Sequence, residues 1–511
     1  MMSVKFYNWT VGLIAASLIT AGAPSWGQDD PTPSTSASAS SNPLEWPRFL
    51  LRSPDQFRLD APPARKSRTT RRELRELRNL QEVRTRAVRR KIRFWNSDPA
   101  IVPWTKTALD MIVLHRPRPP IAARGLALLH GAMYDAYIAA IDTRRSYFRA
   151  PPERLDSRIK PLVNASRSSY VPAHAVVAGA AEIVLQHLFP DQKTGTFEAL
   201  ATDAVESRLY AGVNYRSDVR RGRALGRKVA NLYLERAEYD GVLGTAPAHP
   251  RRTGEEYWVE TPPRFEPATG GPVGTWKPWV MSSAGEARTE SKIPGPPPYA
   301  SAQFMDELDE VLRVQDTLTD AQQQMVIFWD DGPGTFTPAG HWNSIALELL
   351  SANPLGEKDT VRLFGLLNAA LADGAIAAFE AKYFWWSIRP VTAVRRLCND
   401  GARLCTTAEL EDDPSLADHP GWLSYIDTPP FPSYPGGHST FSGAGGRILE
   451  EFFPAADGAI DRIANEAAES RLFGGIHFSS DNNDGLVLGR TVAQIVLDWS
   501  SGLRESPAPT G

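Results

Sequence analysis

The sequence predicts an all-α protein with a large helical-bundle architecture divided into two helical sub-bodies. Apolar residues recur at helical spacing through long Ala-rich segments, from about residue 108 to 240 and again from about 301 onwards. Strand-like alternation of apolar and polar residues is nearly absent. Between the two helical regions, residues 241–300 are rich in Pro, Gly and Trp, which is typical of a loop that connects two packed bodies.

The composition is that of an ordinary globular chain. Of 511 residues, 42% are hydrophobic and 23% are charged, and a chain of this length can bury one large core or two. The formal net charge of −3 gives no global attraction to nucleic acid. We therefore expect no nucleic-acid partner.

The first 27 residues read as a secretory signal peptide. Lys5 precedes an apolar run from Trp9 to Ala21, and Ser25 and Gly27 are small residues at positions −3 and −1 of a cleavage site. An uncleaved anchor is the alternative. The run is short for a bilayer span, and no later stretch reaches about 18 apolar residues. We therefore expect a secreted or periplasmic protein with no transmembrane segment after the signal.

The rest of the chain divides into three predicted segments. Residues 28–60, rich in Pro, Ser, Ala and Asp, predict a disordered leader. Residues 61–300 predict an N-terminal helical region that contains an arginine-rich helix over 65–95 and ends with the Pro/Gly-rich connecting loop. The leucine stripe of that helix favours a solvated, packed helix over a contact with anions or a membrane surface. Residues 301–511 predict a catalytic helical bundle, and we find no repeat of fixed period.

The chain has two cysteines, Cys398 and Cys405. The Asn-Asp-Gly sequence between them predicts a turn, and an oxidising compartment favours one small disulfide loop. Two free buried thiols would instead suit a cytosolic protein.

Three stretches in the last third of the chain place basic side chains on apolar backgrounds, where a charge needs a partner. The first is KYFWWSIRP, residues 382–390. Lys382 and Arg389 are two helical turns apart, which would project both from one helix face. Pro390 places Arg389 at or near a helix end. Two cations on one face repel unless an anion lies between them, and pairing with acids elsewhere is the alternative.

The second stretch is PGGHS, residues 435–439. Gly436 and Gly437 expose backbone N–H groups just before a predicted helix, an arrangement that seats an oxyanion at the helix N-terminus. His438 is then placed to exchange a proton with a ligand oxygen. Taken alone, the pattern also suits a histidine that caps a glycine-rich turn.

The third stretch is SRLFGGIHFSSD, residues 470–481. Arg471 and His477 would lie on different faces of an unbroken helix, but Gly474 and Gly475 can end it and bring them together. Asp481 can accept the other ring N–H of His477 and leave the free nitrogen nucleophilic. A surface arginine and a core histidine are the alternative.

Together, the three stretches resemble the signature of the superfamily that joins type 2 phosphatidic-acid phosphatases, bacterial acid phosphatases and vanadium-dependent haloperoxidases. The resemblance implies a clamp of three cations around an oxyanion, formed by Lys382, Arg389 and Arg471. It implies that the N–H groups of Gly436 and Gly437 complete the seat. It also implies that His438 is the acid/base and that His477 bonds to phosphorus or vanadium.

The second motif departs from the family pattern. The family usually reads Pro-Ser-Gly-His, whereas this chain has Gly436 at the serine position. The missing hydroxyl removes one hydrogen bond to the ligand, worth roughly 1 kcal/mol. We therefore expect a weaker hold on the oxyanion.

Phosphatases and haloperoxidases of this superfamily need the same cage. In the phosphatase, His477 attacks a phosphomonoester and His438 protonates the leaving oxygen. In the haloperoxidase, His477 holds the cofactor vanadate, and hydrogen peroxide oxidises a halide that reacts with a small organic acceptor. The segments RGLALLHGAMYDAYIAA and FWDDGPGTFTPAGHWNSIA resemble bacterial haloperoxidases and favour the second chemistry. Phe431 stands where chloride-using members tend to carry an aromatic residue. A non-catalytic oxyanion binder or a degenerate helical protein is a third alternative.

Two further residues are expected to support the clamp. Asp331 and His341 belong to the stretch DDGPGTFTPAGHW, and we expect Asp331 to pair with a clamp arginine. Ordinary turn residues of a Gly/Pro-rich loop are the alternative. The oligomeric state is left open, a homo-oligomer included. The other histidines are assigned no role: His115, His130, His174, His187, His249 and His419.

Overall fold

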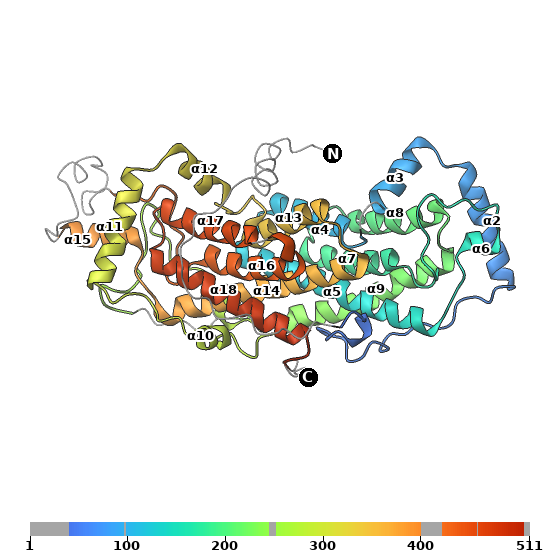
Figure 1. The fold of residues 1–511 in the computed structure, drawn as a ribbon, viewed down its shortest axis with the longest axis horizontal. Coiled ribbons are helices and arrows are strands. Elements are labelled where there is room, and N and C mark those ends of the chain that lie inside the picture. Colours follow the sequence, from blue (N-terminus) through green and yellow to red (C-terminus); the bar gives the residue numbers. More distant parts are fainter. Residues whose placement is uncertain (1–39, 97–98, 245–251, 400–421, 457, 505–511) are drawn as a thin grey trace.

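The computed structural model describes residues 40–96, 99–244, 252–399, 422–456 and 458–504. Within these residues the chain forms seventeen α-helices, 64% of the structure is helical, and no strand is present. The all-α prediction is confirmed, and Figure 1 shows the helices arranged as an elongated body. The predicted signal peptide and Cys405 lie outside the described residues, as does the side chain of Cys398.

The N-terminal half contains eight α-helices and a short 3-10 helix in its described residues. They are η1 (Pro43–Glu45), α2 (Arg68–Glu82), α3 (Arg86–Asn96), α4 (Val102–His115), α5 (Pro119–Ser146), α6 (Pro152–Leu155), α7 (Ala173–Leu188), α8 (Thr196–Ala211) and α9 (Arg216–Tyr239). The described part of the connecting loop adds η2 (Gly271–Thr275) and α10 (Glu286–Ser291).

The C-terminal half continues the helical pattern. Its elements are α11 (Ala302–Asp316), α12 (Asp320–Phe328), α13 (Thr337–Ala352), α14 (Glu357–Trp385), α15 (Pro390–Asn399), α16 (Gly437–Phe452), η4 (Pro454–Ala456), α17 (Ala459–Phe473) and α18 (Ser479–Ser500).

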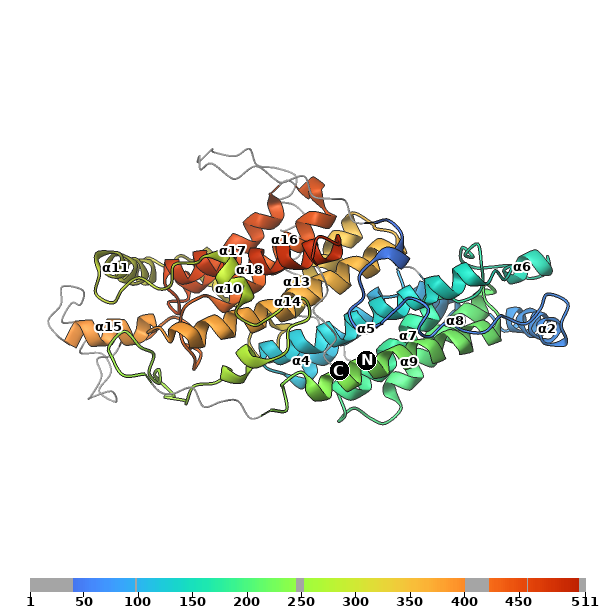
Figure 2. The same cartoon turned by 90° about the horizontal axis from the view of Figure 1, so that it is seen from below.

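Two long helices, α5 and α14, form the centre of the molecule. They pack against each other, and Figure 2 shows them side by side between the two halves. Both are buried over most of their length, because Ala, Gly and Leu allow close packing on every face. By length and composition α14 could also cross a membrane, but 94% of its most apolar window is buried inside the fold. The two halves share one continuous hydrophobic core.

Part of the predicted leader is ordered. Residues 40–60 lie against the core, and the carboxylate of Asp135 in α5 accepts the N–H groups of Phe49, Leu50 and Leu51 at 3.2, 2.8 and 3.1 Å. Trp46 is also buried. The disordered-leader prediction is therefore wrong for residues 40–60, because buried aromatic side chains and backbone bonds outweigh the polar composition.

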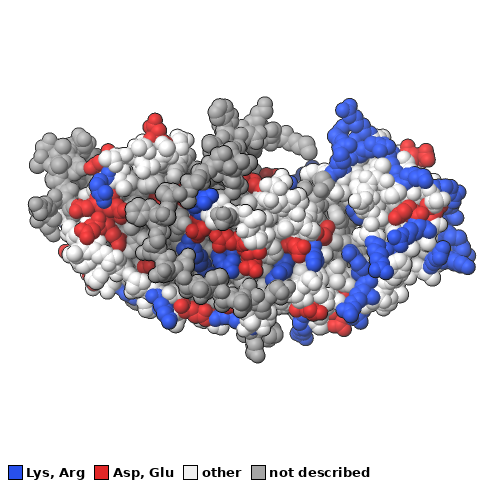
Figure 3. Space-filling model, viewed as in Figure 1, with Lys and Arg blue, Asp and Glu red and all other residues white. Residues whose placement is uncertain are grey.

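The arginine-rich segment forms two helices, α2 and α3, instead of one. Leu77 of α2 and Ile92 and Trp95 of α3 are buried, as the apolar stripe predicts. The arginines point mostly outward, and Figure 3 shows Lys and Arg side chains gathered at this end of the molecule. The structure agrees with the solvated, packed helix that the leucine stripe favours.

The described part of the connecting loop covers the C-terminal half. Trp258 N–H donates to the carbonyl of Trp386 at 2.9 Å, and Gly295 N–H donates to the hydroxyl of Tyr434 at 3.1 Å. The loop thereby packs against the segments that carry the predicted site.

Candidate functional site

The predicted site residues lie where four helix ends meet. Lys382 comes from the end of α14, His438 from the N-terminus of α16, Arg471 from the end of α17, and His477 from the turn before α18. Arg389 comes from the link between α14 and α15. The separate motifs therefore contribute to one neighbourhood.

Arg389 does not belong to the same helix as Lys382. α14 ends at Trp385, and Trp386 takes a left-handed conformation (φ 57°) that stops the helix. The expected projection from one helix face is therefore wrong. The expected helix boundary is confirmed, because α15 begins at Pro390.

The Arg389 guanidinium reaches the turn that carries His477. It donates to the carbonyl of Phe431 at 2.9 Å and to that of Ile476 at 2.7 Å. Its Nη1 lies 3.2 Å from Nε2 of His477. Burial lowers the pKa of Arg389 to about 9, so the side chain stays charged at neutral pH.

Lys382 is fully buried beside Arg389. Its Nζ donates to the carbonyls of Pro432 and Ser433 at 3.0 and 2.6 Å. Burial, followed by the charge of Arg389, holds the pKa of Lys382 well below its usual range. The aromatic ring of Phe431 lies near both cations, with its centroid 5.2 Å from Nζ of Lys382 and 5.1 Å from Cζ of Arg389.

His477 is oriented by a buried carboxylate. Its Nδ1 lies 2.9 Å from Oδ2 of Asp481, as predicted, and this oxygen also accepts the hydroxyl of Ser433 at 2.5 Å. Burial, then the charges of Arg389, Lys382 and Arg471, keep the His477 pKa well below its usual value. The neutral ring then carries its proton on Nδ1 and leaves the Nε2 lone pair available.

Arg471 provides the third buried cation. Its Nε donates to the hydroxyl of Ser470 at 3.0 Å and its Nη2 to the carbonyl of Val326 at 3.1 Å. Burial lowers the pKa of Arg471 to about 10, which still leaves it charged at neutral pH.

His438 is the second residue of α16, and it is half-buried. Its Nε2 lies 3.3 Å from the carbonyl of Asp330. Burial and then the charge of Arg471 lower the pKa of His438 to about 3. The ring is therefore neutral until a negative charge arrives beside it.

Asp331 and His341 form a pair beside the site. His341 Nδ1 lies 3.0 and 3.1 Å from the two carboxylate oxygens of Asp331, and its ring stacks on Trp329 with centroids 4.4 Å apart. Asp331 acts on Arg471 only through its charge, which opposes the lowering of the Arg471 pKa by burial. The expected direct pairing of Asp331 with a clamp arginine is wrong, because His341 takes its carboxylate.

The two glycines of the second motif have different roles. Gly436 N–H donates to the carbonyl of Asp481 at 2.7 Å, so its predicted contact with the oxyanion is wrong. Gly437 is the first residue of α16, and its N–H has no acceptor in the described part of the chain. A Cβ at position 436 would lie 2.8 Å from Oγ of Ser439 and 3.1 Å from Oδ1 of Asn482. The neighbours therefore fill the space that the family's serine needs.

The positive charges of the site are not neutralised by ion pairs with the described residues. Lys382, Arg389 and Arg471 form no ion pair with any described residue, and Nη2 of Arg389 is buried without a hydrogen-bond partner. Unpaired buried cations are costly unless a ligand neutralises them. Three cations, the N–H of Gly437 and Nε2 of His477, which lies beside Arg389, fit a tetrahedral oxyanion such as vanadate or phosphate.

Sequence reasoning missed Ser433. Its hydroxyl donates to Asp481, lies 3.4 Å from Nδ1 of His477, and its carbonyl accepts from Lys382. The serine stands five residues before His438, close to the motif, but no local pattern distinguishes it from a loop serine.

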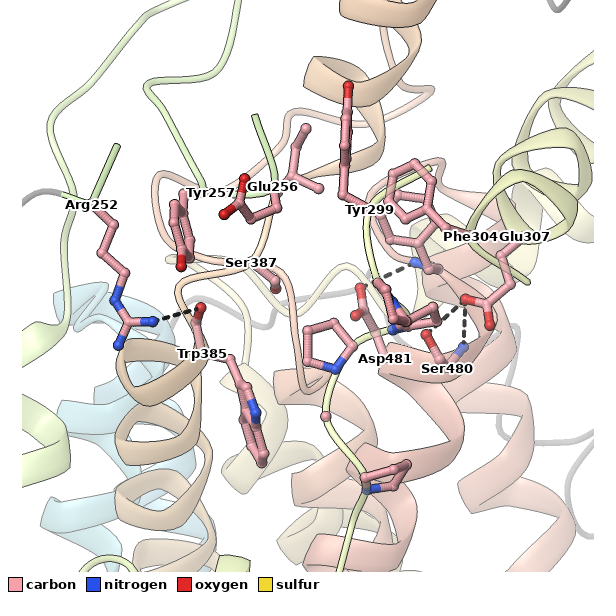
Figure 4. Close-up of a pocket in the computed structure, with 17 residues that line it drawn as sticks. Arg252, Glu256, Tyr257, Tyr299, Phe304, Glu307, Trp385, Ser387, Ser480 and Asp481 are labelled. Atoms are coloured by element: carbon pink, nitrogen blue, oxygen red, sulfur yellow. Dashed lines mark hydrogen bonds between the residues drawn. The ribbon is translucent and has the colours of Figure 1, made fainter. Parts of the chain in front are cut away.

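An outer pocket of about 280 Å³ lies on the other side of Asp481 (Figure 4). Its walls are mainly aromatic and proline side chains, with Glu256, Glu307 and Arg252 at the rim. Asp481 is the residue that it shares with the oxyanion site. The aromatic residues that line it are Tyr257, Tyr299, Phe304, Trp385 and Phe478.

Comparisons with known proteins agree with the geometry. The VCPO second helical-bundle domain matches residues 191–240, 362–459 and 458–505. The chain is 24% identical over 396 residues to the vanadium chloroperoxidase of Curvularia inaequalis, covering 66% of this chain and 61% of that protein. The chain thus spans less than two thirds of this relative.

Solved structures show the same fold. A bacterial vanadium-dependent iodoperoxidase superposes with a TM-score of 0.60 at 23% identity, covering 78% of this chain and 96% of its own. A holo-type bacterial vanadium-dependent chloroperoxidase gives a TM-score of 0.51 at 13% identity, covering 77% and 92%. The resemblance to vanadium haloperoxidases that the three motifs predict is confirmed by these matches.

Proposed function

We propose that this chain is a vanadate-dependent haloperoxidase that uses hydrogen peroxide to oxidise a halide. The net reaction converts hydrogen peroxide, halide and a proton into hypohalous acid and water. The hypohalous acid then halogenates a small organic acceptor and releases a second water. The observation that carries the proposal is the set of three buried cations near Nε2 of His477 that pair with no carboxylate among the described residues.

The residues of the site would divide the work of holding the cofactor. Lys382, Arg389 and Arg471 neutralise the charge of vanadate, and Gly437 N–H adds a backbone donor. His477 offers Nε2 to the metal, while Asp481 and Ser433 hold its ring in place. When bound, vanadate supplies a Lewis acid that activates hydrogen peroxide toward attack by a halide.

His438 is proposed to move the protons. Its pKa is about 3 while the cations around it are unneutralised. A bound oxyanion cancels part of this positive field and raises the pKa of His438 toward neutrality. The ring can then accept a proton from hydrogen peroxide and deliver it to the departing water.

The outer pocket is the proposed place for the organic acceptor. Its aromatic walls suit an apolar or aromatic body, and its rim carries charged groups that can orient a polar substituent. The signal-like N-terminus supports a secreted or periplasmic location, which is likewise a proposal.

The test uses purified protein with and without orthovanadate. Oxidation of iodide, bromide and chloride by hydrogen peroxide is compared with hydrolysis of a generic phosphomonoester. We expect halide oxidation that requires vanadate and is lost in His477→Ala. Hydrolysis that vanadate inhibits, without any halide oxidation, would show a phosphatase. Retained oxyanion binding with neither activity would show a non-catalytic binder.

A further inference from the structure

The N-terminal and C-terminal halves contain the same arrangement of four helices. In the first half α7 packs on α5, α8 and α9, and α5 also contacts α9. In the second half α16 packs in the same way on α14, α17 and α18, and α14 contacts α18. The order of the helices along the chain is also the same. The two halves are therefore two copies of one bundle.

The amino-acid sequences of the two bundles are also similar to each other. Residues 196–236 align without a gap on residues 459–499, and Glu-Ser-Arg-Leu occurs at 206–209 and again at 469–472, a separation of 263 (471 − 208). Gly-x-x-Leu-Gly-Arg follows at 222–227 and 485–490. Ser-Tyr precedes α7 at 169–170 and α16 at 433–434. No single fixed period relates the two halves, because the loops before α7 and α16 differ in length.

Equivalent glycines meet equivalent atoms. A Cβ at Gly179 would lie 2.1 Å from the carbonyl oxygen of Arg223, and one at Gly443 would lie 2.3 Å from that of Leu486. Leu486 follows Arg223 by the same 263 residues (486 − 223). Matching close approaches between backbones show that the paired helices pack in the same register.

Each central helix also anchors an extended segment in the same way. Asp135 of α5 accepts three successive N–H groups, from residues 49–51. Asp373 of α14 accepts three from residues 279–281, at 2.6, 2.9 and 3.0 Å. The duplication thus extends to the segments that cover α5 and α14.

The duplication places a second set of polar residues in the N-terminal bundle. Arg208 stands at the position of Arg471, Asp218 at that of Asp481, His174 at that of His438, and Arg144 at that of Lys382. The position of His477 is occupied by Asn214.

The hydrogen bonds of the second set follow those of the first. Ser169 donates to Oδ2 of Asp218 at 2.6 Å, as Ser433 does to Asp481. Asn214 donates to the Ser169 hydroxyl at 3.2 Å, where His477 lies 3.4 Å from that of Ser433. The shell of the oxyanion site is thus conserved between the two bundles of this one chain.

The charges differ between the two shells. Arg149 makes ion pairs with Glu73, at 2.8 Å, and with Asp218. Arg208 donates to Oδ1 of Asn214 at 3.0 Å and to Asn96. Its guanidinium is therefore held by the amide that replaces the histidine.

A carboxylate from the other half of the molecule acts on the cations of the N-terminal shell. Glu357, the first residue of α14, accepts the N–H of Ala100 at 3.0 Å, four residues after the Asn96 that holds Arg208. Glu357 makes no direct ion pair with a described residue, but its charge raises the pKa values of both Arg208 and Arg144 against the effect of burial. Burial in turn raises the pKa of Glu357.

We propose that the N-terminal bundle holds a second, self-neutralised copy of the oxyanion site. In this copy, the negative charge of Glu357 offsets the positive charges of Arg144 and Arg208, as a bound oxyanion would. Removing this charge leaves Arg144 and Arg208 without the nearby negative charge, which a free tetrahedral anion, phosphate or sulfate, can then supply. Because Asn214 replaces His477, the copy binds such an anion through charge and hydrogen bonds and forms no bond to vanadium.

The test is phosphate binding in a protein whose C-terminal site is disabled. Radiolabelled inorganic phosphate is dialysed to equilibrium against Arg471→Met, Arg471→Met/Glu357→Gln, and the triple variant that adds Arg208→Met. We expect no bound phosphate in the first, one equivalent in the second and none in the third. Glutamine keeps the acceptor for Ala100 N–H, so the change removes charge alone.

Thermal unfolding provides a second measurement that needs only the Glu357 change. We expect Glu357→Gln to melt at a lower temperature than the unaltered chain without phosphate and to gain more stability as phosphate is added. The matched control, Glu357→Gln/Arg208→Met, should lose this phosphate response. The proposal is overturned if the Glu357 variants bind no phosphate, or if removing Arg208 leaves phosphate binding unchanged. Neither readout depends on haloperoxidase activity.

Discussion

The two bundles of this protein present similar shells of polar residues with opposite electrostatic outcomes. In the C-terminal bundle, three buried cations have no ion-pair partner among the described residues, the charge of Asp481 acts on Lys382 and Arg389, and Nε2 of His477 lies beside Arg389. In the N-terminal bundle, Arg149 pairs with Glu73 and Asp218, the charge of Glu357 acts on Arg208, and Asn214 stands in place of the histidine. One scaffold thus supports an unneutralised site, suited to a ligand, and a neutralised one, suited to stability.

The largest predicted difference concerns His477 and its counterpart Asn214. His477→Ala should lower vanadate-dependent turnover on the order of 10³-fold or more, because it removes the nitrogen that would hold the metal. Asn214→Ala should leave turnover unchanged. Steady-state halide oxidation measures both, and equal losses in the two variants would contradict the comparison.

The equivalent arginines should separate binding from stability. Arg471→Met should raise the dissociation constant for the oxyanion about 100-fold, with little loss of folding stability, because a buried cation that no described residue pairs with is costly in the absence of a ligand. Arg208→Met should instead destabilise the fold by about 3 kcal/mol, because Asn214 and Asn96 lose the charged donor that they share, and Glu357 keeps only Arg144 of the two arginines that act on it. Calorimetric titration and chemical denaturation distinguish the two outcomes.

A buried histidine of the N-terminal bundle should make stability depend on pH. Burial lowers the pKa of His130 to about 4, and the unfolded chain titrates near 6.5. Between these values the unfolded state binds a proton that the folded state does not, so stability falls as pH drops from 6.5 to 4, by about 3 kcal/mol. Above pH 6.5 His130 adds no pH dependence.

The C-terminal bundle provides the control for this prediction. Asn368 stands five residues before Asp373, as His130 stands five before Asp135. His130→Asn should therefore flatten the loss of stability between pH 6.5 and 4, measured by denaturant unfolding at several pH values. An unchanged slope would assign the effect to other groups.

Removing the orienting carboxylate should have a moderate effect on activity. Asp481→Asn should lower turnover about 10- to 100-fold, because the His477 ring loses its acceptor and its fixed tautomer. Asp218→Asn should leave turnover intact and lower the unfolding temperature, because Arg149 loses an ion pair. Loss of activity in both variants would argue against separate roles.

The smallest predicted effect concerns Gly436. Gly436→Ser should cost about 1 kcal/mol of stability, because the new side chain meets Ser439 and Asn482. The added change Ser439→Ala should restore most of the loss. The N-terminal copy has this combination of a larger and a smaller residue, Pro172 and Ala175, at the two positions. The midpoints of denaturant unfolding of Gly436→Ser and Gly436→Ser/Ser439→Ala measure both effects.

Local patterns predicted much of the site because the relevant chemistry is local. The His477–Asp481 contact follows from their spacing, and the helix start at Gly437 follows from the glycines before it. Ser433 and the occupied N–H of Gly436 could not be predicted, because both contacts join segments far apart in the sequence. The direct pairing expected for Asp331 failed because His341, ten residues away, takes its carboxylate.

The amino-acid sequence by itself determined the helical fold, the helix boundaries set by Pro390 and Gly437, and the residue types that converge on one anion. The helical fold and the helix boundaries depend on the periodicity of apolar residues and on contacts between residues close in the sequence, so both can be predicted from the sequence. Only the tertiary structure decided which buried charges have partners. Hydrogen bonding of a buried charge depends on distances between distant segments. Arg208 donates to the side chains of Asn214 and Asn96, whereas Arg471 donates to the hydroxyl of Ser470 and the carbonyl of Val326.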